Sequence, residues 1–297
     1  MTPLKNLLVA TDFSSPSRQA ADRAARLART TGAQLRLVHA LSGGTLAQLQ
    51  QLLGLGSAVE QILIEQTRQA LDTMASELGT AQGMAVESAL LQGAVLEEIT
   101  RQAEEMHADL VVLGSRGVGF MRHFVLGSTA DRLLRKSTHP MLVIKQRPHE
   151  PYRRVLVPVD FSAWSAPLID LARRVAPGAH LVLLNAYEVP FEGKLRFASV
   201  GEAAIEKLRM QAHQAAIQQL HALAVDAGLK PADWTLCTPH ADASLAIVEQ
   251  EQELDCDLIV IGKHGQNMAE DLLLGSVTKH VLAGSAGDVL VSTARPA

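Results

Sequence analysis

The segment DLVVLGSRG at residues 109–117 decides the fold, because it occurs again as DLIVIGKHG at residues 257–265. In each copy an aliphatic run typical of a buried parallel strand ends at a glycine. Nine residues separate the second glycine of each segment from the sequence GST at 127–129 or GSV at 275–277. The spacing G-x2-G-x9-G-S therefore occurs twice, at an offset of 148 residues.

Another pair of segments repeats at the same offset. LLVATDFS at residues 7–14 resembles VLVPVDFS at residues 155–162. Several separated segments in one register indicate a duplication of a domain-sized unit. Residues 146–152 separate the copies, and the two prolines there disfavour both helix and strand. We therefore predict one domain over residues 1–147 and a second over 152–297.

Strands and helices alternate within each copy. In the first copy, aliphatic runs predict strands near residues 5–11, 34–40, 84–91, 109–114 and 141–145, with helical patterns over 59–76 and 96–106 between them. In the second copy, apolar residues recur every three or four positions over 205–223, as in an amphipathic helix. This alternation predicts an α/β fold with a doubly wound parallel sheet. Ligands of such sheets bind at the carboxyl ends of the strands, where the strand order reverses.

Composition excludes several classes of protein. The 297 residues are 47% hydrophobic and 20% charged, with a net charge of −4 and no basic block, so we expect no nucleic-acid binding. No apolar stretch reaches the roughly 20 residues that span a bilayer, and the N-terminus has no signal-peptide core. Two cysteines without CxxC spacing predict a reduced, cytoplasmic protein. The eleven histidines show no ligand spacing, so we expect no metal site from the protein alone.

The repeated glycine loop has the composition of an anion site. We expect Gly114 and Gly262 to let backbone N–H groups face a ligand without an intervening side chain, and Gly117 and Gly265 to permit left-handed turns. A helix beginning at the third glycine would add its free N–H groups and a serine hydroxyl. Cationic side chains near the loops would also favour a bound anion. By contrast, the acidic pair at residues 270–271 would repel a triphosphate if it faces the second site.

Asp12 and Asp160 end the first strand of each copy, and two interpretations of them remain open. A carboxylate there is well placed for a ribose hydroxyl, an adenine amino group or a metal carried by phosphates. The alternative is a helix N-cap, because the serines that follow suit a helix start.

Together, the strand ending in Asp-Phe-Ser, the Asp-Leu-Val/Ile-Val strand and the glycine loop resemble the universal stress protein family over nearly the whole chain, twice. The resemblance implies a five-stranded parallel sheet of order 3-2-1-4-5 in each domain, with ATP or AMP at its carboxyl ends. The matching nucleotide-binding positions are Ala10, Thr11, Asp12, Val38, Leu113, Gly114, Arg116, Gly117, Gly127, Ser128 and Thr129, and in the second copy Pro158, Val159, Asp160, Gly262, His264, Gly265, Gly275, Ser276 and Val277.

There are departures from the family pattern. Thr129 stands where the family usually has valine, and Gly93 becomes Ala241 in the second copy. The last strand is the usual dimer contact of the family, so the resemblance implies that residues 141–144 pair with 289–291 within one chain. The exchange of His139-Pro140 for Gly287-Asp288 leaves that pairing geometry open. Whether the whole chain forms a further homodimer is also open.

The favoured function is therefore a stress-response regulator that binds ATP, or AMP or ADP, together with Mg²⁺. One alternative is a slow ATPase or another adenine-nucleotide enzyme, although no residue is assigned a catalytic role. The other is a structural or interaction module whose glycine loops are only tight turns.

Overall fold

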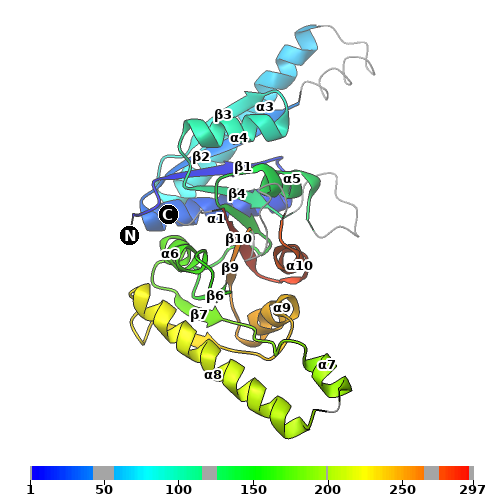
Figure 1. The fold of residues 1–297 in the computed structure, drawn as a ribbon. Helices are drawn as coiled ribbons and strands as arrows, with labels where there is room; N and C mark the ends of the chain where they lie inside the picture. Colours follow the sequence, from blue (N-terminus) through cyan, green and yellow to red (C-terminus); the bar gives the residue numbers. More distant parts are fainter. Residues whose placement is uncertain (1, 43–56, 116–125, 199, 264–273, 294–297) are drawn as a thin grey trace. The chain divides into compact units, whose positions relative to one another are not determined.

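A computed structural model describes residues 2–42, 57–115, 126–198, 200–263 and 274–293 of the chain (Figure 1). The chain divides into two compact units, Met1–Pro151 and Tyr152–Ala297. In both units strands alternate with helices, which confirms the α/β fold predicted from the aliphatic runs.

The strands of the first unit pair in parallel in the order β3-β2-β1-β4-β5. Its elements are β1 Asn6–Ala10, α1 Ser15–Thr31, β2 Gln34–Leu41, α3 Ser57–Gln82, β3 Glu87–Gln92, α4 Val95–Glu105, β4 Leu110–Gly114, α5 Ser128–Lys136 and β5 Met141–Ile144. The predicted order 3-2-1-4-5 is confirmed.

The second unit repeats this topology as β8-β7-β6-β9-β10. Its elements are β6 Arg154–Pro158, α6 Ser165–Val175, β7 His180–Leu184, α7 Glu192–Phe197, α8 Glu202–Asp226, β8 Trp234–Cys237, α9 Ala243–Glu253, β9 Leu258–Gly262, α10 Ser276–Gly284 and β10 Asp288–Ser292. In both units the strand order reverses beside the first strand, between β1 and β4 or between β6 and β9.

Helices cover the sheet in pairs. In the first unit α1 packs with α3, and α4 packs with α5. Right-handed crossovers place these pairs on opposite faces of a parallel sheet. The central strands are therefore buried on both sides, and Leu7, Leu8 and Val9 of β1 have no exposed surface. This packing leaves the strand ends as the place where side chains can meet a ligand.

One strand prediction was wrong at its start. The run 84–91 was expected to be extended throughout, but β3 begins only at Glu87. Gly83 has a φ of 67° and ends α3, and the N–H group of Met84 donates back to the carbonyl of Gly79 at 3.0 Å. Residues 84–86 therefore complete the helix terminus before the chain can enter the sheet.

Candidate functional site

In the first unit the loop after β1 holds Asp12 in a tight turn. Asp12 is half-buried, and its Oδ1 atom accepts hydrogen bonds from the N–H group and the hydroxyl of Ser14, at 3.0 and 2.5 Å. Phe13 between them has a φ of 63°, a left-handed conformation that non-glycine residues rarely adopt. The turn therefore fixes the carboxylate beside the start of α1.

Ser14, and not Asp12, caps helix α1. The Ser14 hydroxyl accepts a hydrogen bond from the N–H group of Ser17 at 3.3 Å. The N-cap interpretation of Asp12 is therefore wrong for the residue itself, because its carboxylate binds the capping serine instead of the helix.

The same turn occurs in the second unit. Asp160 accepts hydrogen bonds from the N–H group and the hydroxyl of Ser162, at 3.0 and 2.5 Å. Phe161 has a φ of 59°, and the cap position of α6 is Trp164. Both acidic residues are thus presented by one backbone arrangement at the end of a first strand.

The residue before each aspartate is held by the neighbouring strand. The N–H group of Thr11 donates to the carbonyl of Val38 at 2.9 Å, and that of Val159 donates to the carbonyl of Leu184 at 2.8 Å. The Thr11 hydroxyl also lies 2.9 Å from the hydroxyl of Ser17 in α1. These bonds extend the β1–β2 and β6–β7 pairing up to the residue before the carboxylate.

Gly114 at the end of β4 is required for packing. A Cβ atom at this position would lie 2.9 Å from the carbonyl carbon of Pro16 and 3.0 Å from the nitrogen of Ser17. The expectation that this glycine keeps the space before a ligand clear stays a prediction, and packing gives Gly114 a second reason to lack a side chain. Its missing side chain makes room for the backbone of α1, and this close approach brings the Asp12 turn to the end of β4.

In each unit a backbone hydrogen bond between described residues joins the two ends of the glycine loop. The N–H group of Gly127 donates to the carbonyl of Ser115 at 2.9 Å, and that of Gly275 donates to the carbonyl of Lys263 at 3.0 Å. Gly127 and Gly275 are also the N-cap residues of α5 and α10. Each helix therefore begins directly beside the end of β4 or β9, as the anion-site hypothesis required.

A glycine N-cap offers no side-chain acceptor to the first turn of a helix. The leading N–H groups of α5 and α10 have no partner within their own helix, and the positive end of the helix dipole lies there. Ser128 and Thr129 are exposed at the start of α5, as is Ser276 at the start of α10. The two helix starts can thus donate hydrogen bonds to an anion.

The two helix starts differ in charge. The first turn of α5 contains Asp131, whose carboxylate is paired with Arg135 at 2.9 Å. At the matching position α10 has Lys279, and its first turn contains no acidic residue. Thr278 next to it donates to the carbonyl of Gly262 at 2.7 Å. Among the described residues, the second helix start is therefore the more favourable for an anion.

The remaining predicted site residues fall into three groups. Exposed or half-buried at the strand and helix ends are Ala10, Asp12, Gly114, Gly127, Ser128, Thr129, Pro158, Asp160, Gly262, Gly275, Ser276 and Val277. Buried beside them are Thr11, Val38, Leu113 and Val159. Arg116, Gly117, His264 and Gly265 lie outside the described residues, as do Glu270 and Asp271.

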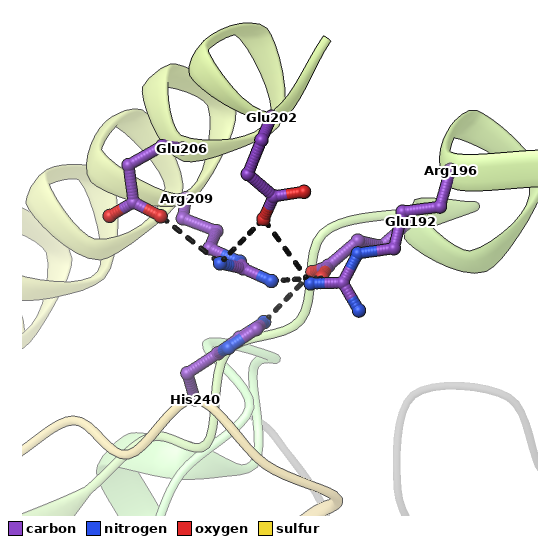
Figure 2. A network of polar contacts seen from close by, with 6 residues as sticks. All are labelled: Glu192, Arg196, Glu202, Glu206, Arg209 and His240. Carbon is purple, nitrogen blue, oxygen red and sulfur yellow. Dashed lines mark hydrogen bonds and ion pairs between the residues drawn. The ribbon is translucent and has the colours of Figure 1, made fainter. Parts of the chain in front are cut away.

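The second unit also contains a polar network that the sequence analysis missed. The carboxylate of Glu192, at the start of α7, accepts a hydrogen bond from Arg209 of α8. It also pairs with Arg196 at 3.2 Å and with His240 at 3.2 Å (Figure 2). Glu206 pairs with Arg209 at 3.0 Å. The hydrogen bond from Arg209 holds the pKa of Glu192 below its usual range, so the carboxylate remains charged.

Aromatic rings adjoin this network after β7 and β8. Tyr187 forms an isolated parallel bridge with His240, and the two rings stack with their centroids 5.1 Å apart. His213 of α8 approaches the other residues of the group, with its ring 5.3 Å from that of Tyr187 and its Nε2 atom 2.8 Å from the Thr238 hydroxyl. The segments after β7 and β8 are thus in contact with side chains of α7 and α8.

Sequence spacing gave only a weak signal for this network. Glu192, Arg209 and His240 are far apart in the chain and come from different elements. The exposed face of an amphipathic helix explains isolated charges such as Arg209 equally well. Only the fold shows that the three side chains converge.

Within the described ranges, no group of three or more His, Cys, Asp or Glu side chains is arranged to hold a metal ion. In the same part of the chain, no helix is both long enough and apolar enough to cross a bilayer.

Comparison with known proteins gives one family for both halves. The model of the universal stress protein family matches residues 3–145 and again residues 151–293. A universal stress protein of Mycolicibacterium smegmatis is 26% identical over 308 residues, covering 96% of each chain. A universal stress protein of Methanocaldococcus jannaschii is 27% identical over 142 residues, covering 48% of this chain and 82% of its own.

Solved structures show the same fold. The crystal structure of a universal stress protein from Archaeoglobus fulgidus has a TM-score of 0.66 at 19% identity, covering 97% of both chains. At this identity the likeness concerns the fold, and it extends over both units.

Proposed function

Because the chain belongs to the universal stress protein family, we propose that each unit binds an adenine nucleotide and that the protein is a nucleotide-dependent regulator of the stress response. The ligand is ATP, or its relatives AMP and ADP, with Mg²⁺ carried on the phosphates. The protein works in the cytoplasm in this proposal. The family membership alone does not decide nucleotide binding, so the support comes from the geometry of the strand ends.

One observation carries the proposal. In both units a helix with a glycine N-cap begins beside the end of the fourth strand, next to a turn that presents an aspartate after the first strand. N–H groups at a helix start suit phosphate, and a carboxylate suits the hydroxyl and amino groups of a nucleoside. The two kinds of group are adjacent, because the N–H group of Gly127 binds the carbonyl next to Gly114.

Each set of residues has a separate task in this proposal. The first turns of α5 and α10, with the Ser128 and Ser276 hydroxyls, hold the phosphates. Asp12 and Asp160 accept hydrogen bonds from the ribose hydroxyls or the adenine amino group. In this proposal the magnesium ion is carried by the nucleotide and neutralises phosphate charge.

The test is calorimetric titration of the whole chain with Mg·ATP and with AMP. We expect two binding sites per chain. Asp12→Asn and Asp160→Asn should each weaken one site about tenfold or more, because a charged hydrogen-bond acceptor contributes about 1.5–3 kcal/mol. Asp22→Asn is the matched control, since Asp22 pairs with Arg26 on α1 at 3.2 Å and has no part in the site.

The outcomes separate the three hypotheses. Failure of the folded protein to bind any adenine nucleotide would overturn the proposal and favour an interaction module. Steady release of inorganic phosphate from Mg·ATP, lost in Asp12→Asn, would instead favour a slow ATPase. We expect binding without such turnover.

A further inference from the structure

Helix α7 of the second unit has little packing of its own to hold it in place. None of its six residues, all of which the structure describes, is buried. Phe191 before the helix and Phe197 at its end are 70% and 93% exposed. Isolated helices shorter than about 12 residues are marginal in water, so the helical state of α7 depends on the contacts that its side chains make.

Glu192 makes such contacts with two separate parts of the unit (Figure 2). Its Oε1 atom accepts a hydrogen bond from Arg209 of α8, and its Oε2 atom lies 3.2 Å from the Nε2 atom of His240. His240 belongs to the segment that follows β8. One carboxylate therefore attaches α7 both to α8 and to the carboxyl end of a strand.

His240 is itself attached to the segment that follows β7. Tyr187 and His240 form a parallel bridge, and their rings stack with centroids 5.1 Å apart. The N–H group of Tyr187 also donates to the carbonyl of Pro239 at 3.0 Å. The segments after β7 and β8 are therefore held together beyond the ends of their strands.

Two residues before Tyr187, the same segment holds the site aspartate. The amide nitrogen of Asn185 donates to the carbonyl oxygen of Val159 at 2.8 Å. This carbonyl belongs to the peptide that precedes Asp160, and because a peptide is planar, the bond fixes the direction in which the aspartate leaves its strand. Contacts thus connect the site to α7 in the order Asp160, Val159, Asn185, Tyr187, His240 and Glu192.

Different side chains stand at the matching positions of the first unit. Counted along strands that pair alike with β1 and β6, Leu41 matches Tyr187 and Gln92 matches His240. Leu41 and Gln92 are neighbours across β2 and β3, but they cannot stack as a phenol ring stacks on an imidazole. Among the described residues, the connection is therefore a feature of the second unit.

We propose that α7 reports the occupancy of the second nucleotide site. A nucleotide bound at Asp160 stabilises the observed aspartate turn and, through the connected contacts, the attachment of Glu192. When the site is empty, α7 detaches more often. This inference rests on the proposed function, because the bound nucleotide is the signal.

Such a coupling acts in both directions. If nucleotide favours the attached state of α7, the attached state favours nucleotide by the same factor. Weakening the contacts of Glu192 therefore lowers the affinity of the second site. Couplings between two sites usually amount to about 5–150-fold, which is large enough to measure.

Hydrogen exchange of residues 192–197 in the whole chain, followed during titration with Mg·ATP, tests the proposal. We expect saturating ATP to slow this exchange at least about fivefold. The midpoint of the slowing should equal the dissociation constant of the second site, shift with it in Asp160→Asn and stay in place in Asp12→Asn. A midpoint that moves with Asp12→Asn instead would overturn the inference.

The connection is broken by giving the second unit the residues of the first. In the double variant Tyr187→Leu, His240→Gln, α7 should exchange as fast as in Glu192→Gln and no longer respond to Mg·ATP. Calorimetry should still show nucleotide in both sites, the second at least about fivefold weaker. Protection of β7 checks that the variant is folded.

Glu202→Gln is the matched control for these variants. Glu202 pairs with arginines of α7 and α8, so its replacement removes a carboxylate from the same network. It leaves the contact between Glu192 and His240 in place, and the response of α7 to Mg·ATP should persist. Loss of the response in Glu202→Gln as well would contradict the route through His240.

The failures are distinguishable. Two occupied sites without any change in the exchange of α7 would overturn this inference and leave the proposed function intact. An undiminished response in the double variant would also overturn it, because the signal would then bypass the connection. Absence of nucleotide binding would overturn the proposed function and this inference with it.

Discussion

A Cβ atom added to Gly114 would lie 2.9 Å from the carbonyl carbon of Pro16. The distance is shorter than side chains tolerate and it involves backbone, which cannot rotate away. The end of β4 and the first turn of α1 are thus packed main chain against main chain, and the position of the Asp12 turn depends on this contact.

Gly114→Ala should therefore destabilise the first unit by about 1–3 kcal/mol, the usual cost of overpacking. Urea unfolding of the whole chain, followed by circular dichroism, checks this through the midpoint of the first unit's transition. Gly193→Ala in α7 is the control, because nothing lies within 4 Å of the added Cβ atom. Equal midpoints for the wild type and Gly114→Ala would contradict the packing role.

Tyr152→Phe should destabilise the second unit by about 1–3 kcal/mol, because it removes a hydrogen bond from a buried carboxyl group. The Tyr152 hydroxyl donates to Asp288 at 2.6 Å, and both residues are nearly inaccessible to solvent. Denaturant titration measures the loss. Tyr187→Phe is the matched control, since among the described residues the Tyr187 hydroxyl has no hydrogen-bond partner; a similar loss in both variants would contradict the prediction.

The ion pairs of Glu192 should protect helix α7 from hydrogen exchange down to acid pH. The Arg209 hydrogen bond lowers the pKa of Glu192 below its ordinary value of 4.5. A carboxyl group with a lowered pKa contributes its stabilisation above the ordinary value and loses it as the pH falls through the lowered one. Protection of residues 192–197 should therefore persist from pH 7 down to the ordinary value and be lost only as the pH falls further, through the lowered pKa.

Glu192→Gln tests the same network at neutral pH. The variant should show at pH 7 the fast exchange that the wild type shows only in acid, while the α8 core around Leu220 stays protected. Glu202→Gln is the control, because that side chain is 64% exposed and its pairs should contribute little. Unchanged exchange in Glu192→Gln would rule out the network as the restraint on α7.

Both thiols should react slowly in the folded protein. Burial raises the pKa of Cys256 to about 12, and burial also raises the pKa of Cys237. Because the thiolate is the reactive form, a disulfide reagent at pH 8 should label the native chain much more slowly than the chain in urea, where two thiols react. Rapid native labelling of Cys256 would contradict its burial.

The fold could be predicted because it depends on patterns that repeat along the chain. Aliphatic strands alternating with amphipathic helices indicate a parallel sheet, and the second copy repeats the five strands in the same order. The acidic turn and the helix starts at Gly127 and Gly275 could be located because such sheets present their loops at one edge. These features follow from local sequence and topology.

Contacts between distant residues could not be predicted in the same way. The role of Gly114 depends on how closely α1 approaches β4, and the convergence on Glu192 depends on where α8 and the segment after β8 meet. His39 lies 2.7 Å from the Thr11 carbonyl and Asn185 donates to the Val159 carbonyl, and this likeness could not be seen in the sequence because the side chains differ and the spacing shifts between the copies. Each of these features is set by packing, for which one sequence contains no periodic signal.

The hydrogen bond between the carbonyl of Ser115 and the N–H group of Gly127, repeated between Lys263 and Gly275, has an evolutionary consequence. It is made by backbone atoms alone, so it survives substitution of the side chains around it. Natural selection can then alter charges on either side of this bond, such as Asp131 and Lys279, without moving the sheet or the helix. After a duplication, such a frame lets the charge beside the helix start change in one half while the other half keeps its own.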